Sequence, residues 1–377
     1  MRISTAIKNT VIICVLAMVG AIFVFKYSTR VFNNANIIYL IVATYIVIYV
    51  TFFTFLWQRD LSQYAWASNQ RLLFIVCTAL IVGAVIIITV LPDVSRVSRF
   101  SAIIEWIERL LARQFPWGSQ TQFNPSGLPF LFIIALPFYY AGNIGYLEVA
   151  GVILFCIVLV KFYKQPNTMW LPLIALVLLP SFYYELLVRS ELFFNMMLIV
   201  ALITLSEQHL DTSKLDIWFF GLAILFGLGL STRTIVGLVY AGYYAYKFHR
   251  HIWNGILFSG FTLIIFGFTL MPFVIWNAQY FFKEGPFSVQ MGYLPADITI
   301  VFVIIVAISG WNTFHLKDLF FYEGILLFVI VVIAFLPIAI HSGIYTAVLK
   351  DKFDITYFIF CTPFLLFSLE NQQINRI

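Results

Sequence analysis

The most informative ionisable residue is Asp93, which follows the apolar segment 72–91 and precedes the amphipathic segment 94–113. Position alone leaves two roles open for a carboxylate at this point. It could be the N-cap of the following helix, where a side-chain oxygen accepts a backbone N–H. It could also be a general base at the outer face of a membrane, taking the proton of a substrate hydroxyl.

A second ionisable group, Glu185, Arg189 and Glu191, lies between the apolar segments 169–184 and 192–206. Glu185 and Arg189 are four residues apart, a spacing at which a helix forms a surface ion pair worth about 0.3–0.5 kcal/mol. Two carboxylates beside a guanidinium could equally bind a cation, a phosphate or sugar hydroxyls. The spacing slightly favours the local ion pair, and a binding site stays the alternative.

Arg233 stands in the short polar break Ser231-Thr232-Arg233-Thr234 between two apolar segments. Taken alone, this arginine is best explained by a side chain that extends to lipid headgroups. A guanidinium beside hydroxyls is also suited to hold a phosphate through paired hydrogen bonds.

The polar stretch 276–296 combines aromatic side chains with amides and a lysine. Aromatic residues are enriched where membrane helices meet the headgroups. Gln279, Lys283 and Gln290 are suited to bind a sugar or a phosphate. The sequence has no phosphate-binding glycine loop, zinc-ligand spacing or nucleophile elbow, so its chemistry would rest on these scattered residues.

These residues belong to a chain with the composition of a membrane protein. Of 377 residues, 62% are hydrophobic and only 10% are charged, whereas a soluble domain has about a quarter charged residues. The net charge of +5 is spread through the loops, so no nucleic-acid partner is expected. The four cysteines lie in apolar runs without metal-ligand spacing, and no disulfide framework is expected.

The apolar runs show no period-two alternation, which favours helices over the strands of a barrel. We predict one integral membrane domain over 1–377: an all-α, polytopic transmembrane bundle of about twelve crossing helices, because most runs suit about 30 Å of hydrocarbon. The segment 127–142 is expected to re-enter the membrane without crossing it, since it is short and contains Pro129 and Pro137. The apolar segments are 10–26, 36–57, 72–91, 127–142, 146–163, 169–184, 192–206, 217–231, 234–246, 256–275, 297–311, 324–340 and 354–369.

The loop 92–126 contains its own helical pattern. Apolar residues recur at helical spacing from Val97 to Leu111, and arginines fall between them at 96, 99, 109 and 113. We expect 94–113 to be an interfacial amphipathic helix, with its apolar face in the acyl boundary and its arginines near lipid phosphates.

In their order along the chain, these features resemble the GT-C superfamily of membrane glycosyltransferases, which use lipid-linked sugar donors. The first part of the match is Asp93 after a membrane helix, then the interfacial segment 94–113. The matching stretches that follow are Pro-Trp-Gly at 116–118, Asn-Pro-Ser-Gly-Leu-Pro at 124–129, Leu-Pro at 179–180, Arg-Ser-Glu at 189–191 and Gly-Leu-Gly-Leu-Ser-Thr-Arg at 227–233. The resemblance covers about 72–295; two extra helices in 10–57 precede it, and helices in 297–369 follow it.

The resemblance implies an inverting glycosyltransferase of the cell envelope, acting in polysaccharide biosynthesis on the periplasmic or extracellular face of a bacterial-type inner membrane. The implied donor is a polyprenyl-phosphate sugar, and the acceptor is a glycan, a lipid or a protein. Asp93 would be the general base, and Glu191 would be a second catalytic residue with an acidic side chain. The implied binding residues are Arg189, Arg233, Glu185, Lys283, Gln279 and Gln290.

The resemblance is incomplete at the acidic residues, which leaves the cofactor open. No second aspartate stands beside Asp93, and Glu191 occupies a place where aspartate is common. No cofactor is therefore certain, and a divalent cation, Mg²⁺ or Mn²⁺, stays open.

Two alternatives stay open. One is a polymerase of lipid-linked polysaccharide that uses a diphosphate-linked donor. The other is a transporter or flippase of lipid-linked sugars, in which charged residues line a route across the bilayer. Few charges lie in the middle of an apolar segment; Glu148 is the clearest and lies near a segment end, which favours an enzyme.

Overall fold

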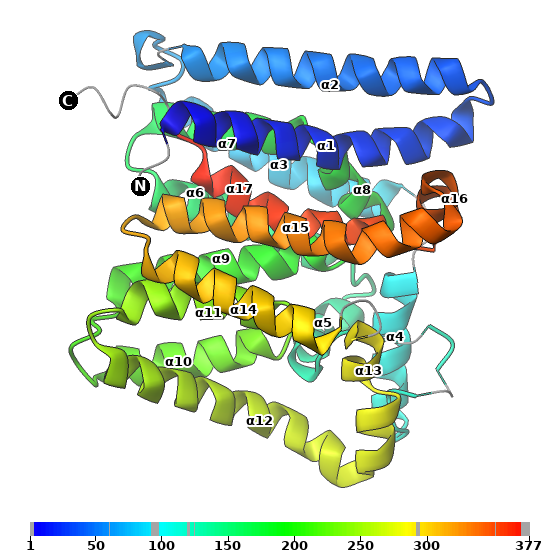
Figure 1. Ribbon diagram of the computed structural model, residues 1–377, viewed down its shortest axis with the longest axis vertical. Helices are drawn as coiled ribbons and strands as arrows, with labels where there is room; N and C mark the ends of the chain where they lie inside the picture. The colour runs from blue at the N-terminus through cyan, green and yellow to red at the C-terminus, as the bar shows by residue number, and fades with distance from the viewer. Residues whose placement is uncertain are drawn as a thin grey trace. The chain divides into compact units, whose positions relative to one another are not determined.

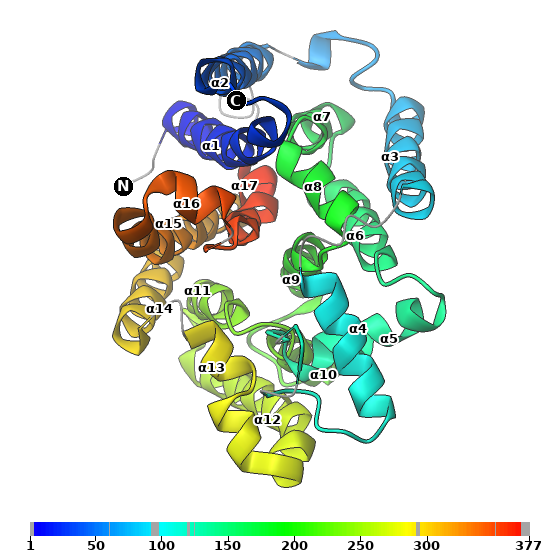
Figure 2. The ribbon, with the colours of Figure 1, turned by 90° about the vertical axis from the view of Figure 1, so that its right-hand side faces the viewer.

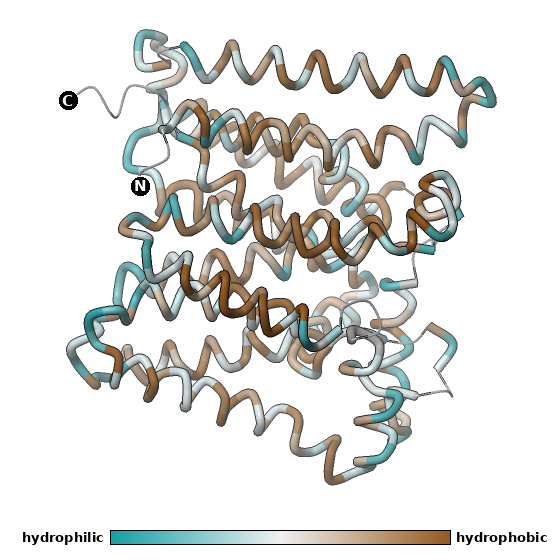
Figure 3. The backbone as a smooth tube through the Cα atoms, in the orientation of Figure 1, coloured by the Kyte–Doolittle hydropathy of each residue, from teal (hydrophilic) through white to brown (hydrophobic). Residues whose placement is uncertain are grey.

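The computed structural model describes residues 4–59, 61–91, 98–118, 121–123, 125–291, 295–350 and 352–370. In these ranges the chain forms helices and no strand, which confirms the all-α prediction. Within the same ranges six helices are long and apolar enough to cross a membrane, or seven if the bent pair α7 (Pro166–Val177) and α8 (Pro180–Val188) is one span. Hydrophobic residues follow the length of these helices and hydrophilic ones gather at their ends (Figure 3). The helices fit a multi-pass membrane protein; about twelve crossings stay a prediction.

By their contacts the helices divide into two compact units, each built from separate stretches of chain. Unit 1 comprises Met1–Ala84, Phe155–Leu186 and Leu316–Ile377, and unit 2 comprises Val85–Leu154 and Leu187–His315. The helices α3 (Gln70–Val90), α6 (Tyr146–Phe162) and α8 contribute to both units.

Unit 1 begins with the paired helices α1 (Thr5–Val31) and α2 (Ala35–Gln58), which lie side by side (Figures 1 and 2). The short helix η1 (Leu61–Gln63) packs against α7. The C-terminal part is α15 (Leu316–Ser342), α16 (Ile344–Leu349), η2 (Ile355–Cys361) and α17 (Thr362–Ser368). Although α17 is short, it contacts α1, α7 and α15, so its side chains are buried. Gly324 permits this packing, because a Cβ there would collide with the Leu365 side chain.

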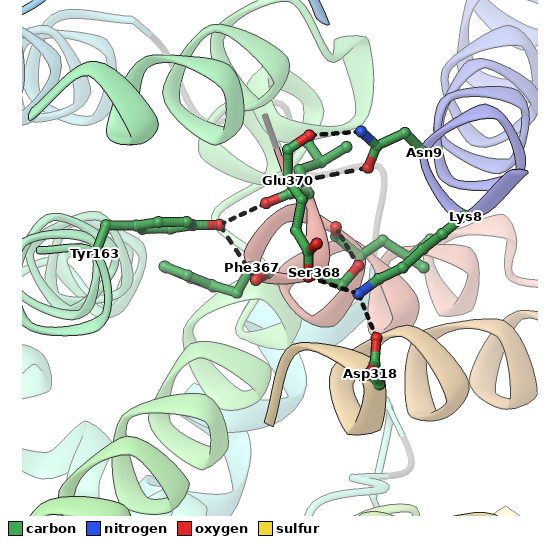
Figure 4. A network of polar contacts seen from close by, with 9 residues as sticks. Lys8, Asn9, Tyr163, Asp318, Phe367, Ser368 and Glu370 are labelled. Carbon is green, nitrogen blue, oxygen red and sulfur yellow. Dashed lines mark hydrogen bonds and ion pairs between the residues drawn. The ribbon is translucent and has the colours of Figure 1, made fainter. Parts of the chain in front are cut away.

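A charged network joins three parts of unit 1 at the N-terminal end of α1 (Figure 4). Lys8 Nζ donates to Asp318 Oδ1 at 2.7 Å and to Glu370 Oε1 at 3.0 Å. Asn9 Nδ2 donates to the Glu370 carbonyl at 2.6 Å. Tyr163 OH lies 3.2 Å from the Leu369 carbonyl oxygen. The end of α17 is thus tied to the starts of α1 and α15 and to the end of α6.

Unit 2 contains the helices from α9 to α14, together with α4 and α5. In it α10 packs against α12, and α11 packs against α14. Their bounds are α4 (Ser98–Leu111), α5 (Pro129–Tyr140), α9 (Leu192–His209), α10 (Ile217–Leu230), α11 (Val236–Phe248), α12 (Ile252–Lys283), α13 (Pro286–Met291) and α14 (Ala296–Trp311).

The stretch expected to be a polar loop from residue 276 is mostly helical. Helical hydrogen bonding continues α12 to Lys283, with one non-helical residue, Asn277 (φ −157°, ψ 86°). The Asn277 side chain accepts from the backbone N–H of Tyr280 at 3.1 Å and so starts the next turn. The helix therefore bends at this residue instead of ending there.

The amphipathic helix α4 forms as predicted, but its apolar face has a different partner. Ile103, Trp106 and Ile107 are buried in a cluster with side chains of α5 and α12, among them Phe132 and Phe273. Expecting this face in the acyl boundary was therefore wrong, because aromatic rings of the protein itself cover it. In Figure 1, α4 runs across the direction of α10 and α12.

The Pro-Trp-Gly turn completes this cluster. Trp117 lies edge-on to Trp106 and Phe273, at centroid distances of 5.3 and 5.0 Å. Gly118 adopts φ 107°, and a Cβ at this position would meet the Tyr280 ring. The turn therefore requires glycine both for its backbone conformation and for the close approach of α12.

Candidate functional site

The candidate site is a buried cluster in unit 2 in which two arginines meet one carboxylate. Oε1 of Glu191 accepts from Nη2 of Arg233 and lies 3.5 Å from Nη1 of Arg99. Only 2–7% of each of these three side chains is exposed. Charged side chains are rarely this buried unless they pair, and removing them from water costs free energy that their pairing has to offset.

Glu191 is positioned by the break between α8 and α9. It is the residue before α9 and makes no side-chain capping bond there. A carboxylate beside the positive end of a helix dipole is favoured. Its side chain is therefore held by the helix end and by the arginines, and not by a capping bond.

Arg233 is positioned by the junction between α10 and α11. Thr232 Oγ1 donates to Asn195 Oδ1 of α9 at 2.7 Å, which fixes this junction against the helix that begins after Glu191. The backbone N–H of Leu128, at the start of α5, donates to the Thr232 carbonyl at 3.0 Å. The Ser-Thr-Arg stretch thus joins α5, α9 and α10 and directs the guanidinium inward.

Arg99 was expected near lipid phosphates, and the structure instead buries it against Glu191. The reason is its place on α4: Arg99, Ile103 and Trp106 share one helix face, which packs into unit 2. The spacing of four and three residues from Arg99 to Ile103 and Trp106 was the signal that could have placed this arginine on the buried face.

The electrostatics of the cluster favour an ionised Glu191. Burial by itself would raise the pKa of the Glu191 carboxyl, but the positive charges of Arg233 and then Arg99 lower it below its ordinary value. The second carboxylate oxygen, Oε2, accepts no hydrogen bond from the described part of the chain. The group is therefore a charged carboxylate with one oxygen engaged by guanidinium donors.

This donor set does not fit the divalent cation that the superfamily resemblance left open. A cation needs carboxylate or carbonyl oxygens free of competing cations. By Coulomb's law, at an effective dielectric constant of about 20, a divalent cation about 5 Å from one guanidinium is repelled by roughly 7 kcal/mol. Among the described residues, no group of three or more His, Cys, Asp or Glu side chains is arranged to hold a metal ion.

Arg189, which was predicted to bind phosphate, contacts backbone carbonyls. Its Nη2 donates to the carbonyls of Ile88 and Leu91, both at 3.1 Å, at the C-terminal end of α3. Its backbone has φ 52°, so it lies past the end of α8, where the helical spacing from Glu185 no longer holds. Arg189 thus binds the last carbonyls of α3, directly before the segment that contains Asp93.

The remaining predicted residues are not part of the described cluster. Asp93 lies outside the described residues, and so does the side chain of Gln290 on α13. Gln279 and Lys283 are exposed near the end of α12. Glu185 is fully buried at the end of α8 and belongs to unit 1.

Comparisons with known proteins gave no match: no family model, no curated protein and no solved structure corresponds to this chain. The chemistry of the site therefore has to be inferred from its residues.

Proposed function

We propose that this protein is an inverting membrane glycosyltransferase of the GT-C type that takes its sugar from a polyprenyl-phosphate donor. The observation that carries the proposal is the burial of two guanidiniums, Arg99 and Arg233, around Glu191 at the end of membrane helices. Guanidinium groups are the preferred protein partners of phosphate. A phosphate fixed to a lipid at the membrane face is the anion best placed to reach such a site.

The described residues on either side of Asp93 are bonded close to this cluster. The carbonyl of Leu91, two residues before Asp93, accepts from Arg189, which is two residues before Glu191. Arg99, six residues after Asp93, contacts Glu191. Both flanks of the segment are thus attached within a few residues of Glu191, which supports a role for Asp93 at the same site.

Each of these groups has a role in the proposed transfer of the sugar. The acceptor hydroxyl attacks the anomeric carbon of the donor as Asp93 takes its proton, which gives inversion in one step. The bond from the anomeric carbon to the phosphate oxygen breaks, and its electron pair leaves with polyprenyl phosphate. Arg233 and Arg99 stabilise the negative charge that grows on this leaving group, as preorganised donors do in other enzymes.

Contacts within unit 1 support the predicted re-entrant segment. Lys8 and Tyr163 both bond to the adjacent residues Glu370 and Leu369, so residues 8 and 163 lie at the same end of unit 1. The chain must then cross an even number of times between them. If α1, α2, α3 and α6 each cross once, α5 does not cross.

Contacts within unit 2 agree with this topology. The chain on either side of α5 is bonded to the ends of neighbouring helices: Leu128 to the end of α10, and Asn143 through its Nδ2 to the Ile88 carbonyl near the end of α3. Both connections fit a short helix that enters and leaves at one face, alongside about twelve crossing helices. A donor and an acceptor that meet at that face would find Glu191 and Arg233 together.

The test is sugar transfer by the purified protein in lipid vesicles. A panel of polyprenyl-phosphate sugars, the matching diphosphate-linked sugars and nucleotide sugars is offered with mixed glycan acceptors. We expect transfer from a monophosphate-linked donor, with inverted anomeric configuration and release of polyprenyl phosphate. Transfer from diphosphate donors alone would indicate a polymerase. Movement of intact donor between leaflets without transfer would indicate a flippase.

A further inference from the structure

We infer that the site in unit 2 handles its phosphate-linked ligand without a divalent cation, because Arg99 and Arg233 take the position such a cation would need beside Glu191. This inference rests on the proposed function for the identity of the ligand. It adds that the two arginines act without a metal ion, a point that the proposed reaction leaves open.

The positive charges around Glu191 disfavour a metal ion at its carboxylate. Its Oε1 is already engaged by Arg233 and lies 3.5 Å from the Arg99 guanidinium. A Mg²⁺ ion binds oxygen at about 2.0–2.1 Å and demands nearly regular octahedral geometry. A cation on Oε2 would share the carboxylate with two guanidiniums, and both would repel it.

The two described side chains that contact the Glu191 carboxylate cannot serve as metal ligands. Arginine has only donors and cannot ligate a cation. At the junction that positions Arg233, Thr232 Oγ1 donates to Asn195 Oδ1 at 2.7 Å. These two side-chain oxygens are bonded to each other, whereas the two guanidiniums carry only donors, which suit an anion.

A guanidinium pair can supply the charge that a metal ion would otherwise provide. Both stabilise the negative charge that grows on a phosphate oxygen. Guanidiniums fixed inside the fold do so without being recruited from solution. Glu191 holds both of them in place while it is itself buried.

The experiment measures binding of a short-chain polyprenyl phosphate to the purified protein by isothermal titration calorimetry, first in EDTA and then in Mg²⁺ or Mn²⁺. We expect dissociation constants within about threefold of each other in the three conditions. Arg233→Met and Arg99→Met should each weaken binding at least tenfold, while Lys8→Met, in the charged network of unit 1, should not change it. The matching polyprenol, which lacks the phosphate, should not distinguish the arginine variants from the wild type.

The outcomes separate this inference from the proposed function. Binding that is lost in EDTA and restored by Mg²⁺ or Mn²⁺ overturns the inference, even if sugar transfer is observed. Binding in EDTA that depends on both arginines supports it, even if no donor in the panel is turned over, in which case the proposed function fails alone. Equal binding of the phosphate and the polyprenol overturns it as well, because the arginines would then contact no phosphate. Folding of each variant is checked by its thermal unfolding curve.

Discussion

The two charged clusters of this protein are built with opposite arrangements. In unit 1 a single cation, Lys8, joins two carboxylates, Asp318 and Glu370, whose side chains are 32% and 19% exposed. In unit 2 a single carboxylate, Glu191, joins two cations, and all three side chains are at most 7% exposed. The first cluster keeps contact with solvent, whereas the second is enclosed by the protein.

This difference suggests different tasks. The unit 1 network attaches the end of α17 to the starts of α1 and α15, and each of its groups lies at a helix end. Such a network is explained by holding the fold together. The unit 2 cluster encloses two guanidiniums beside a single carboxylate, which is costly for stability alone. We therefore expect changes in unit 1 to alter stability without altering activity, and changes in unit 2 to alter activity as well as stability.

The largest effect is expected from a change of the proposed base, Asp93. Asp93→Asn keeps the shape of the side chain and most of its capping ability, since asparagine is also a good N-cap. If Asp93 is the base, sugar transfer should fall on the order of 10²–10⁴-fold while thermal stability stays near that of the wild type. Transfer at the wild-type rate would mean that Asp93 is only a cap.

The next effect separates charge from packing at Glu191. Glu191→Ala removes the carboxylate and leaves two buried guanidiniums without it, which should lower the free energy of unfolding by about 3–5 kcal/mol. Glu191→Gln keeps the volume and one accepting oxygen and should cost less. Thermal unfolding in the same detergent measures both variants. Equal stability of wild type and Glu191→Ala would contradict the cluster as described.

The pH dependence of stability provides a further distinction. Arg233 and Arg99 lower the pKa of Glu191 in the folded protein. Its ion pairs therefore stabilise the folded state fully at pH values above the pKa of the unfolded chain, about 4.3. This stabilisation is lost as the pH falls through the lower pKa that Glu191 has in the folded protein. The melting temperature of the wild type should therefore drop more steeply below about pH 4.3 than that of Glu191→Gln. If the melting temperatures of the two proteins fall in parallel with pH, the ionisation of Glu191 does not contribute to stability.

The smallest effect is expected in unit 1. Lys8→Met removes the cation but leaves Asp318 and Glu370 partly hydrated, so the free energy of unfolding should fall by only about 1–2 kcal/mol. Transfer per folded molecule should not change. A loss of specific activity without a loss of stability would remove the distinction between the two clusters.

The helices themselves could be predicted from the sequence, because membrane spans depend on local hydropathy. The predicted segment 192–206 corresponds to α9 (Leu192–His209), and 217–231 corresponds to α10 (Ile217–Leu230). The predicted segment 256–275 ends too early. The helix α12 continues through a bend at Asn277 to Lys283, and only the side-chain and backbone geometry reveals this. Local patterns thus predict where helices exist better than where they end.

The candidate site could be predicted only in part. Glu191 and Arg233 were selected because charges at membrane edges are costly, and the structure joins them. Arg99 was assigned to lipid, since its partner lies 92 residues away in the sequence and no local rule connects them. The contacts of Arg189 with backbone carbonyls could not be predicted, because such contacts leave no mark in a sequence.

The most direct test of the central distinction compares Arg233→Met with Lys8→Met in one sugar-transfer assay, with both proteins reconstituted in the same lipid and normalised to folded protein. We predict that Arg233→Met loses at least about 10²-fold in transfer rate, the usual worth of a preorganised donor to a developing charge, while Lys8→Met transfers at the wild-type rate. Equal rates for the two variants, whether both normal or both reduced, would contradict the assignment of the Arg99–Glu191–Arg233 cluster as the phosphate site.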